Sequence, residues 1–452
     1  MKKSTCARTR IWREGASFCD ANVTQDFSLD RHSVLNVTPT TQFMRINPTI
    51  CPNRHFRLPF LPLITLASLF LMASVRGKDS KVDDLISSAL SSHFLGDRLE
   101  NLGLLHRDPD HAWLQELWLL GRYHGQYHWS EGSAGDDVGF ETRRLRMGGQ
   151  ARLFKKLTLH AQMVSGSDID PFYNGFTEMW VQWAFMPEMA LTLGQQKHRF
   201  THDRNVSSRY INYLERSMLT NMFGLDYTPA VTLQGVIGPV TYYTGVFSNA
   251  TGWDMGRAFT EFNSGWSCLA AVYYDLGKAL PTDTAHLHFT YLHSEADEQA
   301  TNLDHFMDGF STALILTQNS GSLVVESTVG TGNDQGDAFA LNIQPGWYLT
   351  DNLQLVLRYQ VAASNRAQGL IPQKRYEQSA GMQDGRVYQS GYFGLNFYLA
   401  KHRLKLMTGI EYANMGGKDV WTASTMLRFF FGPHSGGPFP MNQMLHGFLD
   451  HD

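Results

Sequence analysis

A short stretch near the middle of the chain concentrates positive charge. Residues 193–217 read LGQQKHRFTHDRNVSSRYINYLERS, and the only acidic residues among them are Asp203 and Glu215. The basic side chains of this stretch are Lys197, His198, Arg199, His202, Arg204, Arg209 and Arg216. Arginine in particular offers a planar fork of N–H donors that matches the oxygens of phosphate. The chemistry available to this stretch is therefore the binding of small anions.

The elements that would position these side chains are predicted to be strands. Charged residues make up 18% of the chain and aromatic residues 12%, with 40 glycines, a profile that favours many strands joined by turns. Apolar and polar residues alternate in KLTLHAQM (156–163), LQLVLRYQVA (353–362), FGLNFYLA (393–400) and LKLMTGIEYA (404–413). No long helical insertion separates these segments, so βαβ units are not expected.

This alternation predicts a transmembrane β-barrel. In a bilayer every strand edge must be paired, so a closed barrel is the only sheet that can span the membrane. We expect an all-β fold, with an antiparallel barrel of about 16 strands over residues 113–431; 14 or 18 strands are the alternatives. A soluble secreted sandwich or propeller also alternates, and it remains a second interpretation of the pattern alone.

The beginning of the chain has the layout of an export signal. Arg54 and Arg57 precede the apolar run LPFLPLITLASLFLMASV (58–75), and small residues follow it. A single membrane-spanning helix is the alternative. Because Met44 would place the signal at an N-terminus, we interpret the segments as follows: an over-long gene prediction (1–43), a signal peptide (44–77), a periplasmic extension with helical spacing that includes Leu105 (78–112), and a C-terminal tail (432–452).

Removal of this signal changes the charge and the cysteine content of the chain. The first 76 residues hold ten Lys and Arg and four Asp and Glu, so the remainder has 28 basic and 38 acidic residues, a net charge of −10. Cys268 is then the only cysteine, which allows no internal disulfide and no zinc pattern. A basic stretch is unusual in a chain that is acidic overall.

A second group of arginines occurs in FETRRLRMGG, residues 140–149. Strand alternation places Arg144 and Arg146 on the face of Thr142, whereas Arg143 falls on the opposite face. Two arginines on one face are costly in a packed core but suit a water-filled lumen. Since Arg143 cannot face the middle of a bilayer, we expect it near a membrane interface or at a bulge.

Two interpretations of the central stretch are open. It could be a solvated loop whose arginines pair with its own acidic residues. Alternatively, it could fold into the barrel and narrow it, so that arginines replace the hydration shell of a passing anion. Glu215 and Asp203 would then hold the guanidinium groups in place.

The two groups of arginines together resemble the phosphate-selective porins of the O and P type. The resemblance rests on Gly194-Gln195 followed by Phe200, on Ser207-Ser208-Arg209-Tyr210, on Leu214-Glu215-Arg216-Ser217, and on Arg143-Arg144-Leu145-Arg146 upstream. It implies a trimeric, sixteen-stranded channel in the bacterial outer membrane, with an inward constriction loop and a ladder of arginines. The anion-binding and pore-lining residues that it implies are Arg122, Arg143, Arg144, Arg146, Lys197, Arg204, Arg209 and Arg216.

Three features differ from the family pattern. Arg199 stands where proline usually precedes the phenylalanine, and Cys268 stands where a later arginine is often found. The chain also continues beyond the last aromatic strand residue, Phe431.

The predicted function is passive diffusion of small inorganic anions, such as phosphate or polyphosphate, across the outer membrane. The expected partners are these anions, outer-membrane lipids and two further copies of the chain, with no nucleic acid and no cofactor. A general or sugar-conducting porin is one alternative. An outer-membrane hydrolase is another, and would need His198 or His202 beside Ser207 or Ser208 on the outer surface.

Neither catalytic nor metal-binding residues are predicted. No GxSxG, HExxH or phosphate-binding glycine loop occurs. His286 and His288 share a strand face and could hold a metal only with a third ligand.

Overall fold

The computed structural model describes residues 99–433, apart from 134, 263, 302–304 and 333–335. The proposed gene-prediction extension, the signal peptide, most of the periplasmic extension and nearly all of the tail lie outside the described residues and stay predictions. Within the described part of the chain, no helix is long and apolar enough to cross a membrane.

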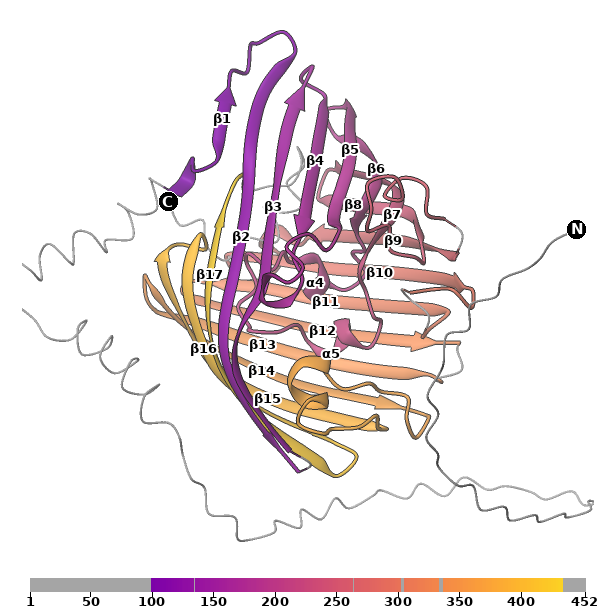
Figure 1. Cartoon of the computed structure of the whole chain (residues 1–452), viewed down its shortest axis with the longest axis vertical. Coiled ribbons are helices and arrows are strands. Elements are labelled where there is room, and N and C mark those ends of the chain that lie inside the picture. Colours follow the sequence, from indigo (N-terminus) through magenta and orange to yellow (C-terminus); the bar gives the residue numbers. More distant parts are fainter. Residues whose placement is uncertain (1–98, 134, 263, 302–304, 333–335, 434–452) are drawn as a thin grey trace, which may run out of the picture. The chain divides into compact units, whose positions relative to one another are not determined.

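The described residues form one antiparallel sheet of 17 strands (Figure 1). The strands are β1 (Leu104–Arg107), β2 (Leu114–Gly132), β3 (Gly135–Leu153), β4 (Leu157–Val164), β5 (Phe176–Met186), β6 (Met189–Lys197), β7 (Tyr227–Ile237), β8 (Val240–Ser248), β9 (Gly265–Asp275), β10 (Thr284–Ala296), β11 (Asp308–Gln318), β12 (Gly321–Thr331), β13 (Ala338–Thr350), β14 (Leu353–Ser364), β15 (Val387–Ala400), β16 (Leu404–Met415) and β17 (Lys418–Phe431).

Sixteen of these strands close into a barrel. Each of β2 to β17 pairs with the next, and β17 pairs with β2 from Val420↔Gly132 to Phe431↔Gly121. The short β1 lies outside this ring and pairs with the start of β2, in a region that β17 does not reach. The predicted barrel and its strand number are confirmed. The helical spacing that includes Leu105 does not form a helix there, because Leu104–Arg107 is a strand that pairs with this uncovered part of β2.

The connections differ in length at the two ends of the barrel. Tight turns at 154–156, 187–188, 238–239, 319–320 and 351–352 lie at one end, together with the start of β2 and the end of β17. Longer loops lie at the other end, including 165–175, 198–226, 249–264 and 365–386. Short turns face the periplasm in outer-membrane barrels, which makes the end with the longer loops extracellular.

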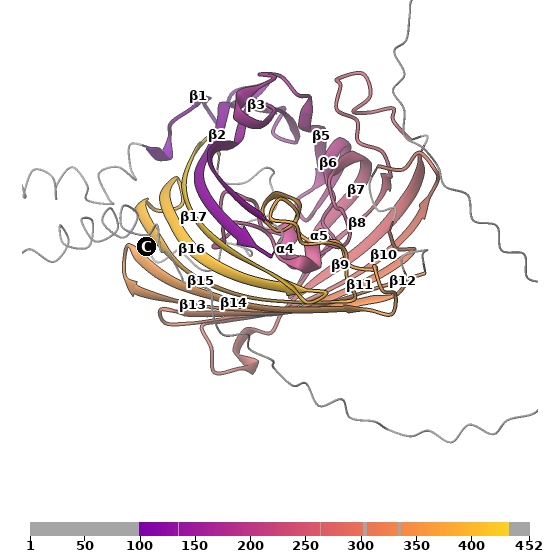
Figure 2. The same cartoon turned by 60° about the horizontal axis from the view of Figure 1, so that its bottom comes forward.

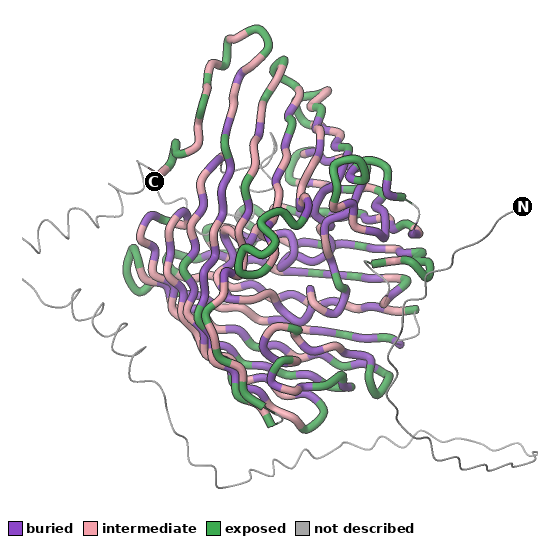
Figure 3. Tube along the Cα trace, viewed as in Figure 1, coloured by how far each residue is buried: buried purple, intermediate pink, exposed green. Residues whose placement is uncertain are grey.

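The two faces of the strands are reversed relative to a soluble protein. In β14, Gln354, Arg358 and Gln360 are buried, whereas Tyr359 on the other face is 49% exposed. Figure 3 shows the alternation of more and less buried residues along the strands. The polar side chains therefore point into the barrel, and the apolar ones point outward, as a lipid bilayer requires.

Two extracellular loops fold into the barrel, one of which contains the basic stretch (Figure 2). We call residues 198–226 the constriction loop; it contains α4 (His202–Asn205) and α5 (Met218–Asn221). We call residues 365–386 the second inward loop; it contains a π-helical turn, Lys374–Gln378. Single 3₁₀ turns also occur at Ser167–Ile169 and Gly277–Ala279. The predicted inward fold of the basic stretch is confirmed.

Apolar packing fixes the constriction loop against one side of the lumen. Phe200 and Phe223 are almost fully buried, with ring centroids 4.7 Å apart. They press against Gly309 of β11, where a Cβ atom would lie 2.8 Å from Phe200 and 2.9 Å from Phe223. At Gly330 of β12, a Cβ would lie 3.0 Å from Phe223. Glycine at both positions lets the loop seat closely on β11 and β12, so that open space remains beside β2 to β6.

Candidate functional site

A buried carboxylate anchors the start of the constriction loop. Glu326 of β12 accepts hydrogen bonds from the backbone N–H groups of His202 (2.6 Å) and Asp203 (3.1 Å) and from the Ser311 hydroxyl (2.9 Å). These two N–H groups open α4 and would otherwise lack partners. At the same end, the Thr201 hydroxyl accepts from the backbone N–H of Arg204 at 3.0 Å. The contacts of Glu326 with the start of α4 therefore fix the position of Arg204 in the lumen.

Cations of the wall bind the carbonyl groups of the same loop. Arg428 of β17 donates to the carbonyl oxygens of Ile211, Tyr213 and Leu214 at 2.9 to 3.1 Å, and Lys405 of β16 donates to Ile211 at 2.9 Å. A carbonyl group satisfies a donor but has no net charge, so these contacts do not pair Arg428 or Lys405 with a carboxylate. The loop is thus held by hydrogen bonds that do not neutralise the wall.

Two of the predicted cations have the same kind of partner. Lys197 Nζ donates to the carbonyl oxygens of Asn205 (3.2 Å) and Val206 (3.1 Å). Arg216 donates to the carbonyl oxygens of Asp203 and Val206, the latter at 2.7 Å. Both side chains therefore reach the middle of the loop and bind neutral carbonyl groups there.

Tyr227, at the start of β7, lies between two further predicted arginines. Arg146 Nη1 donates to the Tyr227 hydroxyl at 2.9 Å, and the guanidinium carbons of Arg146 and Arg204 each lie 5.1 Å from the ring centroid. Arg204 Nη2 is 3.9 Å from Asp226 Oδ1, which is too long for a hydrogen bond. Among the described residues, Arg204 Nε and Nη2 have no acceptor although they are buried. Arg204 thus has two buried donors without an acceptor, whereas Arg122, Arg146 and Arg209 each have one, their Nε.

Arg122 and Arg209 have neutral partners as well. Arg122 Nη1 donates to the Ser208 hydroxyl at 2.7 Å. Arg209 Nη1 donates to the carbonyl oxygen of Pro433, just beyond the end of β17, at 2.9 Å. The Arg209 guanidinium also lies over the Phe430 ring.

These groups surround a cavity on the periplasmic side of the constriction loop. It comprises about 690 Å³ of space, part of it continuous with solvent, between the loop and β2 to β6. Its charged lining residues are Arg122, Glu178, Lys197, Arg199 and Arg209. Arg146 and Arg204 adjoin it through Tyr227, which is part of the lining. We call this space the basic cavity; Glu178 of β5 is the single acidic residue in its described lining.

Two histidines of the basic stretch do not add charge. Burial, together with the nearby charge of Arg204, lowers the pKa of His198 to about 3. Burial also lowers the pKa of His202 to about 4, against the opposing effect of Asp203. Both rings are neutral at pH 7, so these two histidines contribute nothing to the positive charge of the stretch.

A bulge in β3 turns neighbouring arginines toward the constriction loop. The pairing with β2 passes from His124↔Arg144 to Gly125↔Thr142, so Arg143 is the extra residue. The predicted bulge is confirmed. The expectation that Thr142 shares the face of Arg144 is wrong, because the extra residue reverses the alternation between them.

The two arginines at this bulge have different partners. Arg143 donates to both carboxylate oxygens of Glu215, at 2.7 and 3.1 Å. Burial opposes the ionisation of Glu215, but Arg143, Arg144 and Arg375 outweigh it and lower the pKa of this carboxyl to about 2. Arg144 Nη1 lies 3.4 Å from His124 Nδ1. Arg143 is therefore neutralised, whereas Arg144 has no carboxylate partner among the described residues.

The structure separates the eight predicted residues into two groups. Arg122, Arg146, Lys197, Arg204 and Arg209 line or adjoin the basic cavity, whereas Arg143, Arg144 and Arg216 lie outside its lining. Three further basic residues, Arg358, Lys405 and Arg428, also reach the constriction loop from the wall. These residues could have been found from the sequence, because each is a cation on the polar face of a strand with alternating residues, as at Arg358.

The other candidate sites of the sequence do not assemble. His288 stacks on Tyr273 at 4.1 Å, and no group of three or more metal-ligating side chains occurs among the described residues. Ser208 accepts a hydrogen bond from Arg122, and both side chains are buried inside the barrel. The outer-surface arrangement that a barrel hydrolase would need is therefore not formed by these residues.

Comparison with known families agrees with this architecture. The family model described as phosphate-selective porin O and P matches residues 120–267. The match covers about a third of the chain and includes both groups of arginines. The matched segment begins within β2 and ends within β9. It includes the bulge in β3 and the whole constriction loop. The resemblance predicted from the arginine motifs is confirmed.

Solved structures of similar backbone are also porins. The anion-selective porin from Comamonas acidovorans is 13% identical, with a TM-score of 0.49 over 70% of this chain and 99% of that one. OprB from Pseudomonas putida is 12% identical, with a TM-score of 0.49 over 70% and 94% of the two chains. OmpF from Salmonella typhi is 9% identical, with a TM-score of 0.49 over 70% and 98%. No curated protein matches the sequence.

The family match and the closed barrel give the coarse function. The porin lies in the outer membrane of a bacterium, where its apolar outer face meets lipid and its polar lumen forms a channel.

Proposed function

We propose that this porin conducts small anions, and that phosphate or polyphosphate binds transiently in the basic cavity. The observation that supports the proposal is the chemistry of the partners around the cavity. Arg122, Lys197 and Arg209 donate to hydroxyl or carbonyl oxygens rather than to carboxylates. Partners of this kind do not neutralise a cation, and rings of Arg and Lys favour anion passage.

In this proposal Arg204 makes the closest contact with the anion. Its buried Nε and Nη2 groups have no acceptor among the described residues, and a phosphate oxygen would supply one. Arg146, on the other side of the Tyr227 ring, would provide a second charge nearby. A site of this kind attracts an anion, while the neighbouring Glu178 keeps the binding weak enough for release.

The experiment is a planar-bilayer recording on the wild type, Arg204→Ala and the control Arg366→Ala. Arg366 is an exposed residue of the second inward loop and lies outside the lining of the basic cavity. We expect anion-selective reversal potentials, a chloride current that phosphate blocks, and roughly tenfold weaker block in Arg204→Ala, as the loss of one charge-assisted contact implies. Arg366→Ala should behave as the wild type.

A cation-selective wild type would overturn the anion proposal and would favour the general porin. Anion selectivity without phosphate block would leave a general anion channel and would remove Arg204 as a binding residue. Equal block in the wild type and in Arg204→Ala would remove Arg204 as well.

We also propose that the porin assembles as a homotrimer. The support is the match of residues 120–267 to the family model of the porins O and P. The test is the mass of the detergent-extracted protein by light scattering, corrected for bound detergent. A monomer at all detergent concentrations would contradict the proposal.

A further inference from the structure

We propose that the second inward loop is a separate constriction at the extracellular mouth, and that Arg375 is the residue that positions it and so limits the size of solutes. The inference concerns the width of the channel and does not depend on anion selectivity.

The loop reaches well beyond the strands that it connects. It leaves β14 and returns to β15, yet its π-helical turn contacts β2 and β17 on the inner face of the barrel. At Gly132 of β2, a Cβ atom would lie 2.5 Å from the carbonyl oxygen of Ala380, so glycine leaves room for the loop there. The turn thus passes β16 and β17 and covers part of the opening between them and β3.

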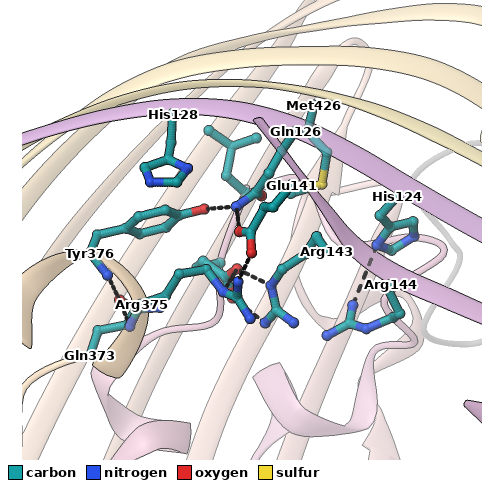
Figure 4. A network of polar contacts seen from close by, with 12 residues as sticks. His124, Gln126, His128, Glu141, Arg143, Arg144, Gln373, Arg375, Tyr376 and Met426 are labelled. Carbon is teal, nitrogen blue, oxygen red and sulfur yellow. Dashed lines mark hydrogen bonds and ion pairs between the residues drawn. The ribbon is translucent and has the colours of Figure 1, made fainter. Parts of the chain in front are cut away.

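Arg375 joins three separate parts of the molecule (Figure 4). Its Nη1 forms an ion pair with Glu141 of β3, and its Nε lies 4.0 Å from Glu215 of the constriction loop. Glu215 is in turn bound by Arg143 at the β3 bulge. One side chain therefore ties the second inward loop to the wall and to the constriction loop.

A neighbouring tyrosine adds an independent contact. The Tyr376 hydroxyl accepts from Gln126 Nε2 at 2.5 Å, and the same amide also donates to Glu141. The Tyr376 ring lies 5.3 Å from the His128 ring (Figure 4). Glu141 is thus shared between Arg375 of the loop and Gln126 of β2.

The loop itself is braced internally. The Gln373 side chain accepts from the backbone N–H groups of Arg375 (3.0 Å) and Tyr376 (2.8 Å), and its own N–H donates to Glu377 at 2.7 Å. Reciprocal backbone hydrogen bonds between Leu370 and Gly385 close its base. Loss of the Arg375 contacts should therefore release a braced unit from the wall rather than unfold it.

The charges of the junction between the second inward loop, β3 and the constriction loop balance. For this reason we assign the junction a role in limiting the width of the channel. Arg143 and Arg375 face Glu141 and Glu215, and every one of the four has an opposite charge within 4.0 Å. A neutral junction across an opening restricts the passage of solutes by size and contributes little to the choice of charge.

The test combines single-channel conductance with exclusion of neutral polyethylene glycols of increasing mass. The variants are Arg375→Gln, Glu141→Gln, the double variant, and Arg375→Lys. Lys374→Gln is the control, because Lys374 is the adjacent, exposed cation of the same turn. Heat-modifiable migration on gels verifies that each barrel is folded.

We expect Arg375→Gln and Glu141→Gln each to raise conductance roughly twofold and to admit larger polymers, as widening of a narrow segment implies. The double variant should match the single ones, because each single variant already removes the ion pair between Arg375 and Glu141. Arg375→Lys should restore part of the exclusion, and Lys374→Gln should leave it unchanged.

Unchanged conductance and polymer exclusion in both single variants would overturn the inference. A second result would also overturn it: polymer exclusion stays constant, while the reversal potential shifts in opposite directions in the two variants. The pair would then act through its charges and not through the width of the channel. Additive effects in the double variant would show that the two residues act separately, and would also overturn it.

Discussion

The two sides of the constriction loop use arginine in different ways. On the periplasmic side, Arg122, Lys197 and Arg209 donate to hydroxyl and carbonyl groups. On the extracellular side, Arg143 and Arg375 bind the carboxylates of Glu215 and Glu141. Similar residues thus produce a charged cavity at one level and a neutral junction at another. The local charge of a lumen follows from the partners of its arginines rather than from their number.

The largest expected effect comes from removing a cation that holds the constriction loop. In Arg428→Gln, loop carbonyl groups at Ile211, Tyr213 and Leu214 lose a buried donor. Unsatisfied buried groups cost about 1–3 kcal/mol each, so we expect the loop to leave its position. The measurements are single-channel noise, which should increase, and phosphate block, which should disappear. A quiet channel with normal block would show that apolar packing at Phe200 and Phe223 suffices.

The next effect concerns the acidic residue of the basic cavity. Glu178→Gln removes the single carboxylate from its described lining. A unit charge about 8 Å away at an effective dielectric constant of about 20 contributes about 2 kcal/mol, and solvent in the cavity reduces this. We therefore expect anion-to-cation permeability to rise about threefold to tenfold. Reversal potentials in a salt gradient measure the ratio.

A matched control for this change is Glu188→Gln. Glu188 is exposed in a periplasmic turn and lies outside the cavity. Its substitution should leave the ratio nearly unchanged. Equal shifts for Glu178 and Glu188 would mean that net charge, and not position in the cavity, controls selectivity.

Salt should distinguish the two sides of the loop further. The Debye length falls from about 10 Å at 0.1 M to about 3 Å at 1 M, so the unpaired charge of the basic cavity is screened. We expect anion selectivity to decline over this range in the wild type. The size exclusion set by the contacts of Arg375 should change less, because those charges are in direct contact. A parallel decline of both properties would contradict the separation of the two sites.

The smallest expected effect is a dependence of the second inward loop on pH. Burial and the charge of Glu411 raise the pKa of Glu377 to about 7, despite hydrogen bonds from Tyr388 and the Gln373 N–H and the charge of Arg358. Because the pKa of Glu377 is higher in the docked loop than in the released loop, protonation of Glu377 favours docking. This contribution to docking is complete below pH 4.5 and is lost as the pH rises through 7. Polymer exclusion should weaken between pH 5 and pH 8.

The comparison for this prediction is Glu377→Gln, which keeps the side chain neutral at every pH. Its polymer exclusion should stay constant over the same range. A pH dependence that survives in this variant would assign the effect to another group.

Much of the fold could be predicted because it depends on local alternation. In β14, the polar face of Gln354, Arg358 and Gln360 was evident from the sequence, and the structure turns that face into the lumen. The inward path of the basic stretch followed from its charge and its resemblance to a porin family. The helical pattern at Leu105 failed because pairing with β2, a long-range contact, decides its conformation.

The arrangement of the site was less accessible to prediction. The outward face that alternation gave Arg143 indicated either a membrane interface or a bulge, and the effect on Thr142 depended on which strand residue was extra. The sequence contains no sign that Arg375 would meet Glu141, 234 positions earlier in the chain. Residues so far apart meet only through closure of the barrel.

The sequence by itself determined the alternation of the strands, the basic character of the constriction loop and the class of channel, because these follow from residue type and local spacing. Only the tertiary structure decided which arginines are neutralised and which keep their charge. That outcome depends on whether a carbonyl or a carboxylate lies within hydrogen-bond distance, and the partners come from strands on different parts of the closed ring.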